Sequence, residues 1–166
     1  MRVDSNTKIW CDMDQVLVNL LEGADIELAK QGLPSFVKAD KDVKWEALKT
    51  VPKFWAKLRP MPDGLLLWKF IRQFNVGILS TPSRRMPTTC GPEKKEWIRK
   101  HLGKVDEILL VPREKKQDWA IGPQGNPSIL IDDHPKNIKE WRSRGGIGIL
   151  HINTLQTITQ LHKLGF

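Results

Sequence analysis

The sequence predicts an α/β protein of Rossmann-like, three-layer architecture. We expect a parallel sheet of five core strands in the order 5-4-1-2-3, with a small helical cap inserted after the first strand. Two observations support this fold class. From residue 60 onward, short apolar runs alternate with amphipathic segments, as in repeated strand–helix units joined by right-handed crossovers. In addition, two apolar runs end abruptly in pairs of aspartates, as buried parallel strands do at their carboxyl edge.

Composition narrows the class of protein. The 166 residues suit one compact domain or a core with a small insert, and 40% hydrophobic with 28% charged residues indicates a folded chain. No apolar run approaches the roughly 20 residues of a membrane span, and the first residues lack the apolar core of a signal peptide. We therefore expect a cytoplasmic protein without a membrane partner. The net charge of +8 favours an anionic partner, nucleotide or nucleic acid, although a solvated basic surface explains it equally well.

The first expected strand begins at Lys8 and ends at two carboxylates, Asp12 and Asp14. Two carboxylates this close either repel, so that one stays protonated, or share a cation. A strand followed by an Asx turn or a helix N-cap explains one such acidic pair about as well.

The segment that follows, residues 19–59, is too long for a simple crossover. An amphipathic helix is expected from residue 20 to a glycine stop at Gly32, followed by a polar, lysine-rich stretch over 35–44. Residues 45–57 are expected to form one or two short helices that carry Trp45, Phe54 and Trp55. We interpret 19–59 as a cap above the carboxyl edge of the sheet, where segments often act as lids, and 1–18 with 60–166 as the core.

The remaining core elements follow in order. The patterns predict a helix over 62–74, a strand over 76–80, a helix over 92–101, a strand over 107–111, a strand over 129–131, a helix over 137–143, a strand over 146–150 and a helix over 154–163. Residues 117–127 contain two glycines and two prolines and are predicted to be a loop.

Polar residues follow several of these strands. They are Asp12 with Asp14, Ser80 with Thr81, Asp132 with Asp133, and the basic Arg113 with Lys115. Because the carboxyl ends of parallel strands meet at one edge, the acidic groups could together hold Mg²⁺. The set suits phosphoryl transfer through a covalent intermediate: one carboxylate attacks phosphorus, and a second acid protonates the leaving alkoxide. A hydroxyl and an ammonium hold the phosphate oxygens.

The run from Asp12 to Leu17, with the sequence DMDQVL, resembles the first motif of the haloacid dehalogenase-like hydrolases. Ser80, Lys115 and the pair Asp132-Asp133 stand where the second, third and fourth motifs of that superfamily fall. Within it, the chain is similar to the 5'(3')-deoxyribonucleotidases. The supporting stretches are Phe54-Trp55 through Leu58, Pro60-Met61-Pro62, Ser80-Thr81-Pro82, Glu93-Lys94-Lys95-Glu96-Trp97 with Gly103, Arg113-Glu114-Lys115 and Ile131-Asp132-Asp133.

The resemblance implies roles for the acidic residues. Asp12 would be the nucleophile that forms an aspartyl-phosphate, and Asp14 the general acid and base. Mg²⁺ would be held by Asp12, the main-chain carbonyl of Asp14, and Asp132, with Asp133 supporting the metal through water. The chain departs from that family at Gln15, because a glycine usually follows the second aspartate of the motif.

It also implies a phosphate site and a base site. Ser80 and Lys115 would bind the phosphate, with Thr81 and Lys94 contacting it or lying nearby. The spacing leaves Lys115, Lys116 and Lys94 open as the phosphate-binding lysine. The cap aromatics Phe54 and Trp55 would face the base, although packing in the cap explains one of the two equally well.

The expected function is that of a Mg²⁺-dependent phosphomonoesterase acting on (deoxy)ribonucleoside monophosphates. Two alternatives stay open: a phosphatase of the same chemistry acting on nucleic-acid ends, and a non-catalytic nucleic-acid-binding module on the same fold. The sequence does not decide base preference, 5' against 3' preference, or monomer against homodimer.

Overall fold

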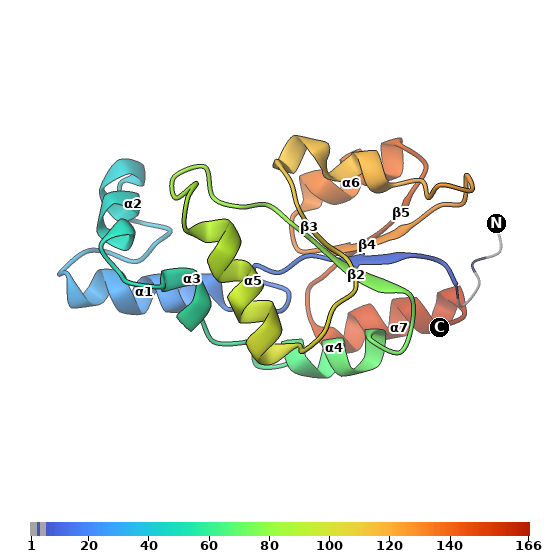
Figure 1. Cartoon of the computed structure of the whole chain (residues 1–166), viewed down its shortest axis with the longest axis horizontal. Coiled ribbons are helices and arrows are strands. Elements are labelled where there is room, and N and C mark those ends of the chain that lie inside the picture. The colour runs from blue at the N-terminus through green and yellow to red at the C-terminus, as the bar shows by residue number, and fades with distance from the viewer. Residues whose placement is uncertain (1–2, 4–5) are drawn as a thin grey trace.

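The computed structural model describes Val3 and residues 6–166 and contains one all-parallel sheet (Figure 1). Its strands are β1 (Ile9–Cys11), β2 (Val76–Ser80), β3 (Ile108–Leu110), β4 (Ile129–Asp132) and β5 (Ile147–Leu150). They lie in the order β3-β2-β1-β4-β5, which confirms the predicted order read from the other side. In the register of the sheet, Ile9 is opposite Val76 on one side and Ile129 on the other.

Helices cover both faces of this sheet. The helical elements are α1 (Leu20–Lys30), α2 (Lys41–Lys49), α3 (Phe54–Lys57), α4 (Gly64–Ile71), α5 (Cys90–His101), the 3-10 helix η1 (Arg113–Trp119), α6 (Pro135–Ser143) and α7 (Thr154–Leu164). Figure 1 shows η1 and α6 on one face, with α4 and α7 on the other. Within the described chain, no helix combines the length and the apolar character needed to cross a membrane.

The alternation of side chains in β1 divides the core in two. Ile9 and Cys11 point into the larger apolar cluster, whereas Trp10 between them joins a smaller cluster with Leu130 and Trp141 on the other face. All five are buried. Because both faces of the strand are buried, its apolar run is continuous, which is why it could be recognised from sequence.

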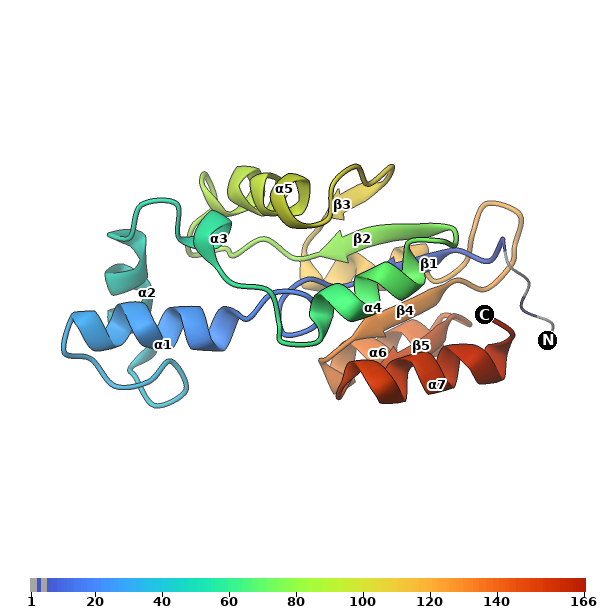
Figure 2. The ribbon, with the colours of Figure 1, turned by 90° about the horizontal axis from the view of Figure 1, so that it is seen from below.

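The helices expected in the cap lie beyond the carboxyl edge of the sheet, at one end of the molecule (Figures 1 and 2). Helices α2 and α3 form where one or two short helices were expected. Helix α2 begins at Lys41, within residues 35–44, which were expected to be a polar stretch. Asp40 explains the earlier start, because its side chain accepts hydrogen bonds from the N–H groups of Asp42 and Val43 at 2.9 and 3.1 Å.

Helix α3 is held against α5 of the core. The main-chain N–H of Trp55 donates to Glu93 at 2.9 Å, and Lys53 pairs with Glu96 at 3.0 Å. Further along the chain, η1 occupies the start of the segment predicted as a loop over 117–127. That helix begins at Arg113 and reaches Trp119 before the glycines and prolines interrupt regular structure.

Candidate active site

The site is built on the turn that follows β1. The N–H of Asp12 donates to the carbonyl of Ile131 at 2.9 Å, which extends the pairing of β1 with β4 by one residue. The chain then folds back, and the carbonyl of Met13 accepts from the N–H groups of Leu17 and Val18 at 2.8 and 2.9 Å. Asp12 is therefore fixed at the carboxyl edge of the sheet, and it is only 7% exposed.

Gln15 occupies a strained position in this turn. Its φ is 59°, in the left-handed region that costs a non-glycine residue roughly 1 kcal/mol. Its side-chain oxygen accepts from the N–H of Leu21 at 3.0 Å, in the first turn of α1. The glutamine therefore gains a hydrogen bond to the start of α1 that a glycine could not make.

One half of the site is centred on Lys116, whose side chain is 3% exposed. Its Nζ lies 2.7 Å from Asp132 Oδ2 and 3.0 Å from Asp12 Oδ1. Asp132 also accepts from Asn137 Nδ2 at 2.9 and 3.1 Å and from the N–H of His134 at 2.8 Å. Burial alone would lower the pKa of Lys116, but Asp12 and Asp132 outweigh it and raise that pKa above its ordinary value.

The other half is centred on Lys94, which is 1% exposed and comes from α5. Its Nζ donates to Asp14 Oδ2 at 2.7 Å and to Ser80 Oγ at 3.0 Å, and it lies 5.2 Å from the centre of the Trp55 ring. Burial raises the pKa of Asp14, with a smaller contribution from Asp12, even though Lys94 opposes this. A carboxyl whose pKa is raised retains its proton more readily, which suits a general acid.

Three carboxylates could hold a cation. Oxygens of Asp12, Asp132 and Asp133 all lie within 4.8 Å of one another. Asp12 Oδ1 is buried and, within the described chain, makes no hydrogen bond, because its contact with Lys116 lacks hydrogen-bond geometry. Oxygen donors of this kind, one with an unused lone pair, fit a hard cation such as Mg²⁺. Burial, and to a smaller extent the neighbouring Asp12 and Asp132, raises the pKa of Asp133 to about 7.

A cavity of about 410 Å³ opens beside Asp14. Its walls include Trp45, Trp55 and Thr81. The two indole rings stack with their centres 6.3 Å apart and an interplanar angle of 24°. Trp55 Nε1 and Thr81 Oγ1 are buried and, among the described residues, have no hydrogen-bond partner.

Two sequence-based assignments change with the structure. Lys115 lies away from the acidic residues of the site, 64% exposed and 3.8 Å from Asp118, whereas its neighbour Lys116 contacts Asp12 and Asp132. Phe54 does not share the cavity with Trp55: it is 2% exposed and lines a separate hollow against α1. Successive residues of a helix are rotated by about 100°, so neighbours in α3 face different directions.

The structure also brings in residues that sequence reasoning missed. Asn137 fixes the Asp132 carboxylate, and Trp45 stacks on Trp55. Asn137 could have been inferred from the sequence, since it lies in the first turn of the helix that directly follows the second acidic pair. The remaining assignments, Ser80 and Thr81 among them, lie at the carboxyl edge as expected, and their roles stay predictions.

The strand order is that of the haloacid dehalogenase-like fold. No protein-family model and no curated protein sequence matches this chain. Solved structures do match. A hydrolase from Streptococcus pneumoniae TIGR4 aligns with a TM-score of 0.63 and 12% identity over 96% of this chain and 100% of that one.

Two further structures match with lower scores. The L-2-haloacid dehalogenase of Xanthobacter autotrophicus has a TM-score of 0.53 and 9% identity over 93% of this chain and 88% of that one. A chain of the Pnkp1/Rnl/Hen1 RNA repair complex has a TM-score of 0.54 and 15% identity, over 91% of this chain and 44% of that one. At these identities, the similarity establishes a shared fold.

Proposed function

We propose that this protein is a Mg²⁺-dependent phosphomonoesterase that dephosphorylates nucleoside monophosphates through an aspartyl-phosphate on Asp12. The observation that supports this most is the difference between two neighbouring carboxylates. Asp12 lies at the edge of the sheet beside the ammonium of Lys116 and two further acids, where its carboxylate could attack a bound phosphate. Asp14, two residues on, has a raised pKa and suits a proton donor.

In the proposed reaction, a carboxylate oxygen of Asp12 attacks phosphorus and the bond to the leaving alkoxide breaks. Asp14 gives its proton to that alkoxide, which departs as the nucleoside alcohol. Asp14, now ionised, takes a proton from a water molecule whose oxygen attacks the phosphorus of the aspartyl-phosphate. Inorganic phosphate is released and Asp12 is restored. Lys94 and Ser80 hold phosphate oxygens during both steps.

Asp12, Asp132 and Asp133 are the residues that would hold the metal. When bound, Mg²⁺ supplies positive charge that neutralises phosphate oxygens and the crowded carboxylates. Lys116 keeps Asp12 and Asp132 in place, and Asn137 fixes the orientation of Asp132.

The same fold includes dehalogenases, and the proton donor separates the two chemistries. A halide leaves as a stable anion and requires no proton, whereas an alkoxide requires one. In dehalogenation Asp14 would have no proton to give to the leaving group, and only its second task, the activation of water, would remain. Phosphate-ester cleavage therefore accounts for more of this site.

The cavity beside Asp14 supports a nucleoside as the leaving group. Trp45 and Trp55 offer aromatic surface, and base–aromatic stacking is worth about 1–3 kcal/mol per base in single-strand binders.

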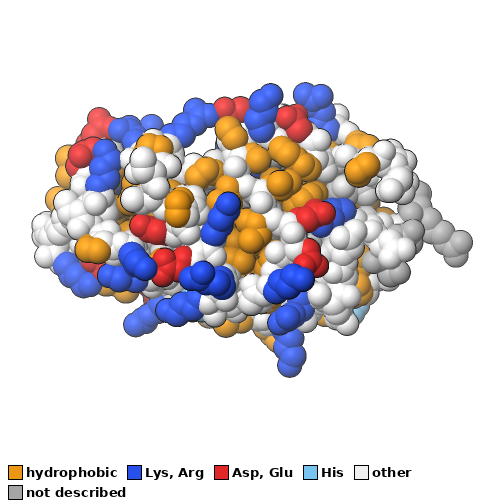
Figure 3. Space-filling model, in the orientation of Figure 1, with side chains coloured by type: hydrophobic (Ala, Val, Ile, Leu, Met, Phe, Trp, Pro, Cys, Tyr) orange, Lys and Arg blue, Asp and Glu red, His pale blue; other side chains and the backbone are white. Residues whose placement is uncertain are grey.

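Phosphatase action on nucleic-acid ends is the second candidate. It is favoured by the net charge of +8 and by the structural match to a chain of an RNA repair complex. Against it, the arginines at the cavity mouth already pair with acids, Arg84 with Glu114 and Arg113 with Glu140 at 2.6 Å. On the face in Figure 3, Lys and Arg side chains are spread around the rim, and no single basic stripe crosses it.

The test is a panel of nucleoside monophosphates and end-phosphorylated oligonucleotides, each with and without Mg²⁺. We expect phosphate release from mononucleotides that stops with a chelator and falls by about 10³-fold or more in Asp12→Asn. Asp118→Asn, at an exposed acid outside the site, is the matched control and should keep full activity. Release only from oligonucleotide ends supports the second candidate. Salt-sensitive nucleic-acid binding that survives Asp12→Asn, without phosphate release, would indicate a binding module.

A further inference from the structure

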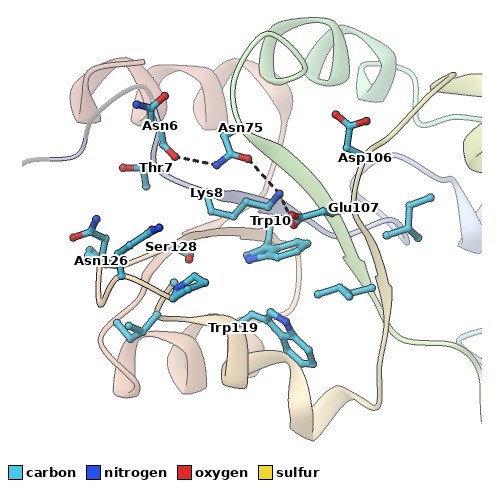
Figure 4. A pocket seen from close by; sticks show the side chains of 17 residues that line it. Asn6, Thr7, Lys8, Trp10, Asn75, Asp106, Glu107, Trp119, Asn126 and Ser128 are labelled. Carbon is cyan, nitrogen blue, oxygen red and sulfur yellow. Dashed lines mark hydrogen bonds and ion pairs between the residues drawn. The ribbon is translucent and has the colours of Figure 1, made fainter.

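A second cavity lies at the opposite edge of the sheet from the catalytic residues (Figure 4). Its volume is about 820 Å³, twice that of the cavity beside Asp14. It is lined where the strands begin, by Lys8 before β1, Asn75 before β2, Glu107 before β3 and Ser128 before β4. The strands separate the two cavities, so a molecule bound here cannot touch the reacting groups.

The cavity lies on the face where the crossover from β3 to β4 is short. η1 ends at Trp119, and the loop of residues 121–127 follows without a longer helix. Trp10, Leu109 and Trp119 therefore form an aromatic and aliphatic floor with open space above it. Concave sites with an apolar floor and a few polar groups are typical of small-molecule binding.

Two indole N–H groups in this floor have no acceptor among the residues that the structure describes. Trp10 is 4% exposed, and nothing in the described chain accepts a hydrogen bond from its indole N–H. The same holds for the indole N–H of Trp119, which is half-buried. Among the other buried tryptophans, Trp68, Trp97 and Trp141 each donate their indole N–H to a main-chain carbonyl. The indole N–H of Trp55 has no acceptor among the described residues. The indole N–H groups of Trp10 and Trp119 are not enclosed by protein, so water can accept from them in the free cavity, and an acceptor on a bound ligand can take the place of that water.

The charges around the cavity exclude an anion. Lys8 is already neutralised, because its Nζ lies 2.6 Å from Glu107 and also donates to Asn75 at 3.3 Å. The same ammonium lies 4.6 Å from the centre of the Trp10 ring. Asp106 adds a further negative charge to the wall. A phosphorylated ligand would meet two carboxylates and no unpaired cation here.

We propose that this cavity, which we call the amino-edge pocket, binds a neutral planar heterocycle with ring-nitrogen or carbonyl acceptors, such as the base of a free nucleoside. The flat faces of the ligand contact Trp10, Trp119 and Leu109, and its acceptors receive the two indole N–H groups. Asn126, at the rim, is placed to contact a sugar (Figure 4). The site therefore takes an uncharged ligand, in contrast to the phosphate-binding edge of the sheet.

The test follows the indole N–H signals of the full-length, ¹⁵N-labelled protein by NMR. The chain has seven tryptophans, so each cavity has its own reporters. Adenosine and thymidine are the probes, and inorganic phosphate is the comparison. We expect saturable shifts of the Trp10 and Trp119 signals with a nucleoside and none at these two with phosphate. Shifts confined to Trp45 and Trp55, or no shift at millimolar nucleoside, overturn the proposal.

Two substitutions test the role of the donors. Trp10→Phe keeps an aromatic ring but removes its N–H, and should weaken nucleoside binding about tenfold, the equivalent of one hydrogen bond. Trp119→Phe should also weaken nucleoside binding about tenfold. Because Trp119 is less buried, this variant replaces Trp10→Phe in the test if Trp10→Phe fails to fold. Trp45→Phe, beyond the opposite edge, is the matched control and should leave the affinity at Trp119 unchanged. Unchanged affinity in both pocket variants contradicts the proposal.

Discussion

Replacing Lys116 by methionine should cost much of the stability of the metal-free protein. The substitution keeps the length of the side chain but removes the cation between Asp12 and Asp132. Removing one partner of a buried ion pair typically costs 3–5 kcal/mol. Here Asp132 keeps its hydrogen bonds from Asn137 and from the N–H of His134, and its raised pKa lets it take up a proton. We therefore expect the free energy of unfolding to fall by about 3 kcal/mol, the lower end of this range, which lowers the urea midpoint by about 1.5 M.

Lys115→Met is the matched control, one residue away. Lys115 is 64% exposed and 3.8 Å from Asp118, so its loss should change the free energy of unfolding by less than about 0.5 kcal/mol. Mg²⁺ should restore part of the stability lost in Lys116→Met, since it brings positive charge back to the same carboxylates. Equal urea midpoints for the two variants would refute the assignment of Lys116 to the site.

Three further predictions concern single side chains. The pKa of Asp133 is raised from 3.8 to about 7, so its proton stabilises the folded state at low pH, and this stability is lost as pH rises through about 7. Without metal, the free energy of unfolding of the wild type should therefore fall by about 1.4 kcal/mol relative to that of Asp133→Asn between pH 6 and pH 8. Urea denaturation of both proteins at the two pH values measures this difference. Gln15→Gly should be more stable than Gln15→Ala by about 1 kcal/mol, because both lose the bond to Leu21 but only alanine keeps the strained φ; equal melting temperatures would contradict this. Lys94→Met should lower kcat by about tenfold or more while Lys95→Met, at an exposed neighbour, does not, and equal kcat values would remove Lys94 from the reaction.

The fold and the sheet edge that carries the acidic residues could be predicted because their signals are local. An apolar run that ends in Asp12, and a second that ends in Asp132, already mark two central strands, and parallel strands bring their ends to one edge. The sheet order then follows from the few topologies that right-handed crossovers allow.

The lysines could not be assigned in the same way. Lys115 and Lys116 are adjacent in a 3-10 helix, where one residue is a third of a turn, and the phase of that helix depends on packing. The contact of Lys94 with Asp14 joins residues 80 positions apart, so no local pattern signals it. The same holds for the amino-edge pocket, because an open donor such as Trp10 is visible only when its surroundings are known.

The most direct test of the proposed chemistry is to look for phosphate on Asp12 itself. The wild type, turning over a nucleoside monophosphate with Mg²⁺, should be quenched in acid and digested, and its peptides examined by mass spectrometry. We predict a phosphorylated peptide that contains Asp12, that is absent from Asp12→Asn and that disappears when a chelator is added before substrate. Steady phosphate release without any phosphorylated peptide, or with phosphate on another residue, would contradict the account.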